Sequence, residues 1–235
     1  MQGLGLFVPF KTVNTGFKSV GDTNEMSSRR MLTMDKFDPR TTALLIINMT
    51  NDLLGWEGVR PLVPRLEKLL NEARKRSVMV VFSSLAFCNN GADSGQLGKF
   101  WQPIGKGEVL VKGTPGATIM PELSPRAGEP VLERNRYSAF FNSELDAMLR
   151  GKGIETLIIG GYSTNFCCDS TARDANFRDY NVVVLEDGTA PIALEEAGGH
   201  AISAEQVQST VLANLRRGFA QVATIEEVLG AMNGA

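Results

Sequence analysis

The sequence predicts an α/β protein, a three-layer α/β/α sandwich built on a mostly parallel, doubly wound sheet. From residue 40 onward, short apolar runs alternate with segments of helical periodicity, which is the pattern of repeated βαβ units. The runs are apolar throughout, as in parallel strands that are covered on both faces. Right-handed crossovers then place helices on both sides of the sheet, and ligands of such folds bind at the carboxyl ends of the strands.

The individual elements follow from local patterns. The predicted strands are 43–47, 78–82, 131–132, 156–159, 181–185 and 222–223. The predicted helices are 64–76, 143–150, 169–179, 203–217 and 224–231. Helical spacing of leucines defines the first helix, a capping box of Ser203 and Gln206 opens the fourth, and Thr224 caps the last. Residues 84–128 are rich in Gly and Pro and predict a long loop region of functional importance.

Composition narrows the class of protein. The 235 residues are 43% hydrophobic and 21% charged, which predicts one globular domain over residues 36–235. Residues 1–35 are polar and poorly periodic, and we expect them to form an N-terminal arm that packs on a neighbouring subunit rather than a secretion signal. The formal charge of −2 argues against nucleic acid or an anionic membrane as a partner. No apolar run approaches the roughly 20 residues of a membrane span.

Cysteine and histidine usage predicts the compartment and excludes one kind of site. Three cysteines, two of them adjacent, form a poor disulfide framework and favour the reducing cytoplasm. The single histidine, His200, excludes a zinc site built from two or three histidines. We therefore expect neither a metal nor a cofactor.

Three predicted strand ends carry polar side chains that can converge. Asn48 follows the first strand, Arg134 follows the third, and Cys167 lies where the fourth strand leads into a helix. At the first turn of a helix, free N–H groups and the helix dipole favour a thiolate and can hold an oxyanion. The alternative interpretation is that Cys167 is a small buried apolar residue. Cys168 competes for the same role, since only one of two adjacent helical residues faces the site.

The segment 161–175 (GYSTNFCCDSTARDA) resembles the cysteine-loop motif of the isochorismatase-like cysteine hydrolase superfamily. That superfamily includes nicotinamidases, N-carbamoylsarcosine amidohydrolases and ureidoacrylate amidohydrolases. The other matching segments are 43–53, 112–116 with 121–123, 136–140 and 184–187, so that the resemblance runs from about residue 40 to the end of the chain.

The resemblance implies a mechanism and its residues. Cys167 would attack the carbonyl carbon of an amide or ureido group, and the backbone N–H groups of Ser163 and Cys167 would hold the oxyanion. A cis peptide bond would join Tyr162 and Ser163. Family members are mostly dimers or tetramers, so we expect a homodimer or homotetramer. The nicotinamidase metal site needs an acid and two histidines, which this chain does not have.

Two positions depart from the family pattern. Asn48 stands where the family has its general-base Asp, and Arg134 stands where it has Lys. An amide takes no proton, Arg keeps its charge but does not deprotonate, and losing a general base costs about 10²–10⁴-fold in rate. Asp52 and Glu133 are the nearby substitutes. However, Asp52 matches a family acid that is usually structural, and Glu133 should point off the opposite face of its strand from Arg134.

These residues are compatible with several hypotheses about the function. The leading one is a cytoplasmic cysteine hydrolase that cleaves a C–N bond of a small amide, carbamoyl or ureido compound through a thioester. Arg134 would support the thiolate or anchor a substrate carboxylate, and Asn48 would orient substrate or water. The alternative is a catalytically degenerate binding or interaction protein, and Asn48 fits shifted chemistry, lost turnover or an engineered change. Vinyl-ether cleavage ranks below both, because it relies on the missing strand-one acid.

Aromatic residues in the predicted loops suggest the character of the substrate. We assign Trp101, Tyr162, Phe87 and Phe140 to the substrate pocket, although such residues also serve as core. Their rings favour a flat or partly apolar small molecule.

Overall fold

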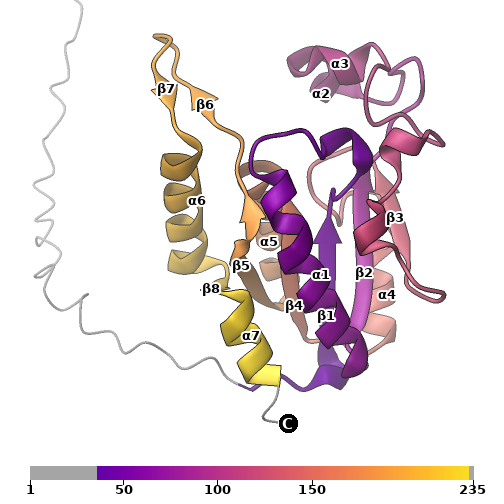
Figure 1. The fold of residues 1–235 in the computed structure, drawn as a ribbon, viewed down its shortest axis with the longest axis vertical. Helices are drawn as coiled ribbons and strands as arrows, with labels where there is room; N and C mark the ends of the chain where they lie inside the picture. Colours follow the sequence, from indigo (N-terminus) through magenta and orange to yellow (C-terminus); the bar gives the residue numbers. More distant parts are fainter. Residues whose placement is uncertain (1–35, 233–235) are drawn as a thin grey trace, which may run out of the picture. The chain divides into compact units, whose positions relative to one another are not determined.

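A computed structural model describes residues 36–232 of the chain. The arm expected over residues 1–35 therefore lies outside the described residues. The central sheet has six parallel strands in the order β3-β2-β1-β4-β5-β8 (Figure 1). The strands are β1 (Thr42–Ile47), β2 (Met79–Leu85), β3 (Val131–Arg134), β4 (Thr156–Tyr162), β5 (Asn181–Ala190) and β8 (Gln221–Ala223).

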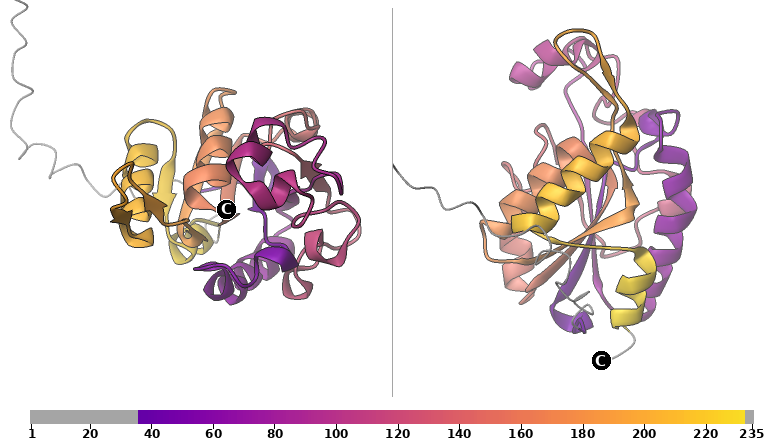
Figure 2. Two further views of the ribbon diagram at one scale, coloured as in Figure 1. Left: turned by 90° about the horizontal axis from the view of Figure 1, so that it is seen from above. Right: turned by 90° about the vertical axis from the view of Figure 1, so that its left-hand side faces the viewer.

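Helices cover both faces of this sheet, which confirms the predicted three-layer α/β/α sandwich. The helices are α1 (Val59–Lys75), α2 (Gly95–Phe100), α3 (Gln102–Gly105), α4 (Leu145–Gly151), α5 (Asp169–Asn176), α6 (Ala204–Gly218) and α7 (Ile225–Met232). Helices α1 and α7 pack together on one face, while α4, α5 and α6 lie on the other (Figure 2). The two inner strands β1 and β4 are buried along their whole length, as expected for strands covered on both faces.

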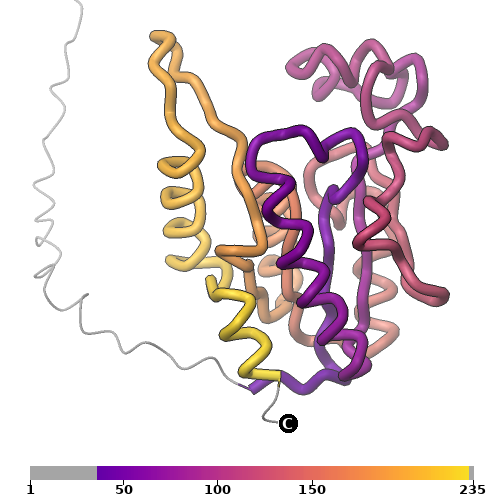
Figure 3. The backbone as a smooth tube through the Cα atoms, in the orientation of Figure 1, coloured from indigo at the N-terminus to yellow at the C-terminus, as the bar shows by residue number. Residues whose placement is uncertain are grey.

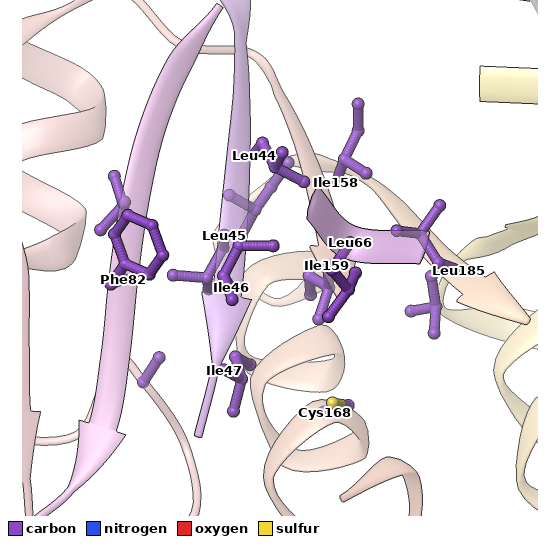
Figure 4. Packing of buried hydrophobic residues seen from close by; sticks show 14 of the residues in the cluster. Leu44, Leu45, Ile46, Ile47, Leu66, Phe82, Ile158, Ile159, Cys168 and Leu185 are labelled. Carbon is purple, nitrogen blue, oxygen red and sulfur yellow. The ribbon is translucent and has the colours of Figure 1, made fainter. Parts of the chain in front are cut away.

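The core fills the space between the sheet and its helices. Leu66 of α1 and Leu185 of β5 belong to the same buried cluster as Ile46, Ile158 and Cys168 (Figure 4). Full burial of each such aliphatic side chain contributes about 1.5–3 kcal/mol. The sheet is therefore rigid where its strand ends present the side chains of the site.

Several element bounds differ from the predictions for physical reasons. Helix α1 begins at Val59 instead of Pro64, because burial of Val59, Leu62 and Val63 outweighs the single helical hydrogen bond that Pro64 removes. Helix α4 begins at Leu145 after a turn in which the hydroxyl of Ser143 accepts the N–H of Leu145 at 3.3 Å. The predicted capping box at Ser203 is confirmed.

Two segments rise above the carboxyl ends of the strands (Figure 3). One is the region 84–128, predicted as loop, which holds the short helices α2 and α3. The other is a small hairpin of β6 (Leu194–Glu195) and β7 (Ala201–Ile202), which periodicity did not predict. Both lie at the end of the sheet where ligands of parallel α/β folds bind.

Candidate active site

The sheet order brings the three predicted strand ends together. Strand β1 lies between β2 and β4, and Arg134 at the end of β3 is the register partner of Leu85 on β2. Asn48 follows β1 directly, and Cys167 lies in a π-helical turn, Thr164–Cys168, that joins β4 to α5. The sequence predicted Cys167 in the first turn of a helix. The structure places it in the π-helical turn that directly precedes α5.

Asn48 is held in one orientation by its neighbours. Its backbone has a positive φ of 53°, a conformation that Asn adopts more readily than most residues. Its side-chain Oδ1 accepts the N–H of Leu85 at 2.9 Å and Nη2 of Arg134 at 3.1 Å. Because the oxygen faces these two donors, the amide Nδ2 faces the sulfur of Cys167 at 3.0 Å.

Arg134 is buried behind the sulfur, with only 3% of its surface exposed. Its Nε donates to the hydroxyl of Ser83 at 2.9 Å, and its Nη1 donates to the carbonyl of Arg136. The same Nη1 lies 3.7 Å from the sulfur of Cys167. The guanidinium is thus surrounded by protein groups and does not line the cavity described below. This position favours support of a thiolate over capture of a substrate carboxylate.

The two adjacent cysteines occupy different environments. Cys167 lines the cavity, whereas Cys168 is fully buried in the apolar core (Figure 4). Burial, followed by the charge on Cys167, raises the pKa of the Cys168 thiol well above its ordinary value. Cys168 therefore behaves as a protonated core residue, and Cys167 is the cysteine that faces the site.

The chain between β4 and Cys167 approaches the backbone of β1 closely. Gly161 has a φ of +118°, and a Cβ atom there would lie 2.0 Å from the carbonyl oxygen of Ile47. Only glycine fits this position. The peptide bond between Tyr162 and Ser163 is cis, at the place that the family resemblance implies. Ser163 lines the cavity, and its carbonyl accepts the N–H of Cys168 at 3.0 Å.

A cavity of about 710 Å³ opens in front of Cys167. Its wall is mainly apolar and aromatic, and it consists of Asn48, Leu53, Trp56, Leu85, Gln96, Leu97, Phe100, Trp101, Leu110, Arg136, Tyr137, Tyr162, Ser163, Phe166, Cys167 and Ile192. Two of the predicted pocket aromatics, Trp101 and Tyr162, are on this wall. Trp56 packs edge-on against both, with ring centroids 5.1 and 6.3 Å away.

The structure corrects the other two predicted pocket aromatics. Phe87 is fully buried, and its backbone pairs with Leu110 and Lys112. Phe140 is also buried and stacks on Tyr180 at 6.0 Å. Neither lines the cavity. Both rings serve the packing beneath the loops, which was the alternative interpretation of such residues.

Sequence reasoning missed three polar residues of the wall: Gln96, Arg136 and Tyr137. Arg136 is the charged member of the wall within the described chain. Its Nη1 donates to the carbonyls of Asp93 and Asn135. The signal for Arg136 and Tyr137 was present in the segment 136–140, which matches the family motif.

Comparisons with known proteins identify the family. The model of the isochorismatase domain matches residues 42–227. The chain belongs to the isochorismatase family of hydrolases. It is 31% identical over 216 residues to the ureidoacrylate amidohydrolase RutB of Caulobacter segnis, covering 82% of this chain and 86% of that protein. A second RutB, from Agrobacterium fabrum, is 29% identical over 84% of this chain and 92% of its own length.

Solved structures of the family show the same fold. A cysteine hydrolase from Pseudomonas syringae pv. phaseolicola superposes with a TM-score of 0.80 at 27% identity, covering 87% of this chain and 98% of its own. An isochorismatase family protein from Desulfovibrio vulgaris superposes with a TM-score of 0.68 at 32% identity, covering 80% and 95%.

In this isochorismatase-family site, the carboxylates of Asp52 and Glu133 do not reach the cavity. Asp52 accepts the N–H of Leu110 at 2.7 Å, and Glu133 is exposed, away from the buried Arg134 on the same strand. Neither lines the wall. Across residues 36–232, no three His, Cys, Asp or Glu side chains gather where they would hold a metal ion. No helix in the same range is long and apolar enough to cross a membrane.

Proposed function

We propose that this isochorismatase-family protein is a cysteine-dependent hydrolase that cleaves a C–N bond of a small amide, carbamoyl or ureido compound. One observation carries the proposal: the cavity-facing sulfur of Cys167 accepts Nδ2 of Asn48 at 3.0 Å and lies 3.7 Å from the guanidinium of Arg134. Two N–H donors and a fixed positive charge favour a thiolate. The amidohydrolase names of the curated relatives support the reaction type.

The mechanism begins with attack of the Cys167 sulfur on the carbonyl carbon of the substrate. The backbone N–H groups of Ser163 and Cys167 hold the oxygen that becomes negative, a kind of stabilisation worth about 10²–10³ in rate for each donor. Breaking the C–N bond releases the amine and leaves a thioester on Cys167. Water then attacks the thioester carbon, and the sulfur leaves as a thiolate.

The cavity indicates what the substrate looks like. Its volume of about 710 Å³ is within the range that encloses a drug-sized molecule. The rings of Trp101 and Tyr162 favour a flat or partly apolar body, as the sequence suggested. Nη2 of Arg136 has no hydrogen-bond partner among the described residues, so we propose that it pairs with one carboxylate of the substrate.

We also propose that the protein acts in the cytoplasm as a homodimer or homotetramer, as the family resemblance implies. Light scattering of the full chain should then give two or four times the mass of 25.5 kDa. A single chain mass would contradict this part of the proposal.

The competing function is ligand binding without turnover, and the amide at Asn48 is the observation that favours it. Alkylation by iodoacetamide separates the two. An active nucleophile predicts that Cys167 reacts at pH 7.5 at least about tenfold faster than Cys88 of the same chain, because the thiolate is the reacting form and its donors favour it. Peptide mass spectrometry locates the label.

Two variants serve as controls for this experiment. Cys167→Ala should abolish the fast reaction, and Cys168→Ala should keep it, because Cys168 lies in the core. Labelling of Cys167 that is no faster than labelling of Cys88 would support the degenerate binding protein instead.

A further inference from the structure

The proposed reaction needs a proton that the groups touching the sulfur do not supply. Cleavage of an unactivated C–N bond releases a nitrogen that must be protonated as it leaves. The two side chains on the sulfur, Asn48 and Arg134, are an amide and a guanidinium, and neither exchanges protons at neutral pH. The carboxylates of Asp52 and Glu133 are outside the cavity. The proton carrier is therefore another group on the wall.

Tyr137 has the position that such a carrier requires. It lines the same cavity as Cys167, and its ring packs on that of Phe166, the residue before the nucleophile, with centroids 5.1 Å apart. No group among the described residues forms a hydrogen bond with its hydroxyl. The hydroxyl is thus available to a bound substrate.

The electrostatic environment keeps this hydroxyl protonated until a strong base appears beside it. Burial and then the negative charge of Cys167 raise the pKa of Tyr137 above its ordinary value. A departing amine nitrogen is such a base.

The other cavity tyrosine is placed differently. Tyr162 packs edge-on against Trp56 at 6.3 Å. Burial raises its pKa to about 12, and the charge that acts on it is that of Glu57 rather than that of Cys167. Tyr162 therefore fits a wall that shapes the substrate, whereas Tyr137 packs on Phe166, the residue before the nucleophile.

We propose that Tyr137 is the proton carrier of this site, a catalytic residue that replaces the strand-one acid whose place is taken by Asn48. The inference rests on the proposed hydrolase function. In the first step the Cys167–carbon bond forms, the C–N bond breaks, and the Tyr137 O–H proton moves to the leaving nitrogen. In the second step water adds to the thioester carbon, its proton returns to the tyrosinate, and the C–S bond breaks to give the acid and the thiolate.

The test compares two leaving groups on one acyl group. Wild type and Tyr137→Phe are each mixed with 4-carboxyphenylacetamide and with the 4-nitrophenyl ester of the same acyl group, both of which offer Arg136 a carboxylate. Acylation of Cys167 is followed by released ammonia or nitrophenolate. Nitrophenolate leaves as a stable anion and needs no proton. We expect the variant to lose about 10²–10³-fold on the amide and less than about threefold on the ester.

The ester reaction also reports whether the variant folds, because it needs the intact site. Tyr180→Phe is the matched control, since its hydroxyl donates to Asp146 outside the cavity, and it should leave both rates unchanged. Equal losses on amide and ester, or no loss on either, would overturn the assignment of Tyr137. The assignment would also be overturned if the ester acylated Cys167 of the wild type while the amide was not cleaved.

Failure of the hydrolase proposal gives a different result. In that case neither substrate acylates Cys167 in the wild type, so there are no amide and ester rates to compare. The assignment of Tyr137 then falls with the function on which it rests.

Discussion

At the scale of single residues, the sulfur of Cys167 meets two donors and, within residues 36–232, no acceptor. Asn48 and Arg134 reach it as an amide and a guanidinium, and Oδ1 of the amide is occupied by the N–H of Leu85. These two groups stabilise negative charge on the sulfur, but they do not transfer protons. In the family pattern position 48 is a general-base Asp, which moves the proton.

An aspartate at position 48 should restore the general base that the family pattern has there. In the Tyr137→Phe background, we expect Asn48→Asp to raise the rate of amide hydrolysis by about 10–100-fold. The first carboxylate oxygen keeps the bonds from Leu85 and Arg134, and the second replaces Nδ2 at 3.0 Å from the sulfur. Steady-state release of amine measures the effect. Asn48→Ala in the same background is the control, and a rescue by Ala as large as that by Asp would contradict the explanation.

The sequence was sufficient to name Cys167, Asn48 and Arg134, because each follows a recognisable strand. The strand pattern alone left Cys168 as a competitor, and it was the family resemblance that pointed to Cys167. Adjacent residues differ only in direction, and the direction here depends on the π-helical turn Thr164–Cys168, for which no sequence pattern was available. The same limit applies to Phe87, whose apolar ring suits a pocket and a core equally well.

At the scale of elements, some strands continue beyond their predicted ends through polar or small residues. Strand β4 continues through Gly160 and Gly161 to Tyr162, although glycine in a strand normally signals a break. The close approach of Gly161 to Ile47 of β1 explains the glycine. Strand β5 continues through Gly188 to Ala190 in the same way. Tertiary contacts decide these ends, and local periodicity contains no information on them.

A mostly buried ion pair ties helix α1 to the turn before β3, the strand that carries Arg134. Nε and Nη2 of Arg74 bind both carboxylate oxygens of Glu129 at 2.8 and 2.7 Å, with side-chain exposures of 10% and 13%. Burial raises the pKa of Glu129, but the hydrogen bonds from Arg74 and from the N–H of Arg126 outweigh it, so that the pKa lies below its ordinary value.

This ion pair predicts a pH-dependent contribution to stability. A lowered pKa means that the contribution is present above the unfolded value of about 4.3 and is lost as the pH falls through the lower folded value. We expect Glu129→Gln to reduce the free energy of unfolding by about 1–3 kcal/mol at pH 7 and by less at pH 3. Urea unfolding of both proteins at the two pH values is the measurement.

An exposed ion pair provides the control. Lys68 and Glu226 lie 3.5 Å apart with exposures of 62% and 84%, and such pairs contribute little. Glu226→Gln should therefore change stability much less than Glu129→Gln. A difference between wild type and Glu129→Gln that is as large at pH 3 as at pH 7 would contradict the role given to the carboxylate.

At the scale of the whole molecule, the order of apolar runs was enough to predict the layers, the parallel sheet and the edge at which the site lies. It was not enough to predict the cavity. The wall is assembled from segments that are distant in the sequence, among them Trp56, Trp101, Tyr137 and Ile192. Their meeting depends on the path of the region 84–128 and of the hairpin β6–β7, which no short-range pattern specifies. The matching segment 136–140 contained Arg136 and Tyr137, but only this path places them on the wall.

The central claim is that one cavity-facing sulfur forms a covalent acyl intermediate. Intact-protein and peptide mass spectrometry of the wild type, quenched with acid within seconds of mixing with 4-nitrophenyl phenylacetate, tests it most directly. The account predicts one phenylacetyl group per chain, located on Cys167, absent from Cys167→Ala and retained in Cys168→Ala. An unmodified chain, or a label on Cys168 or Cys88, would contradict it.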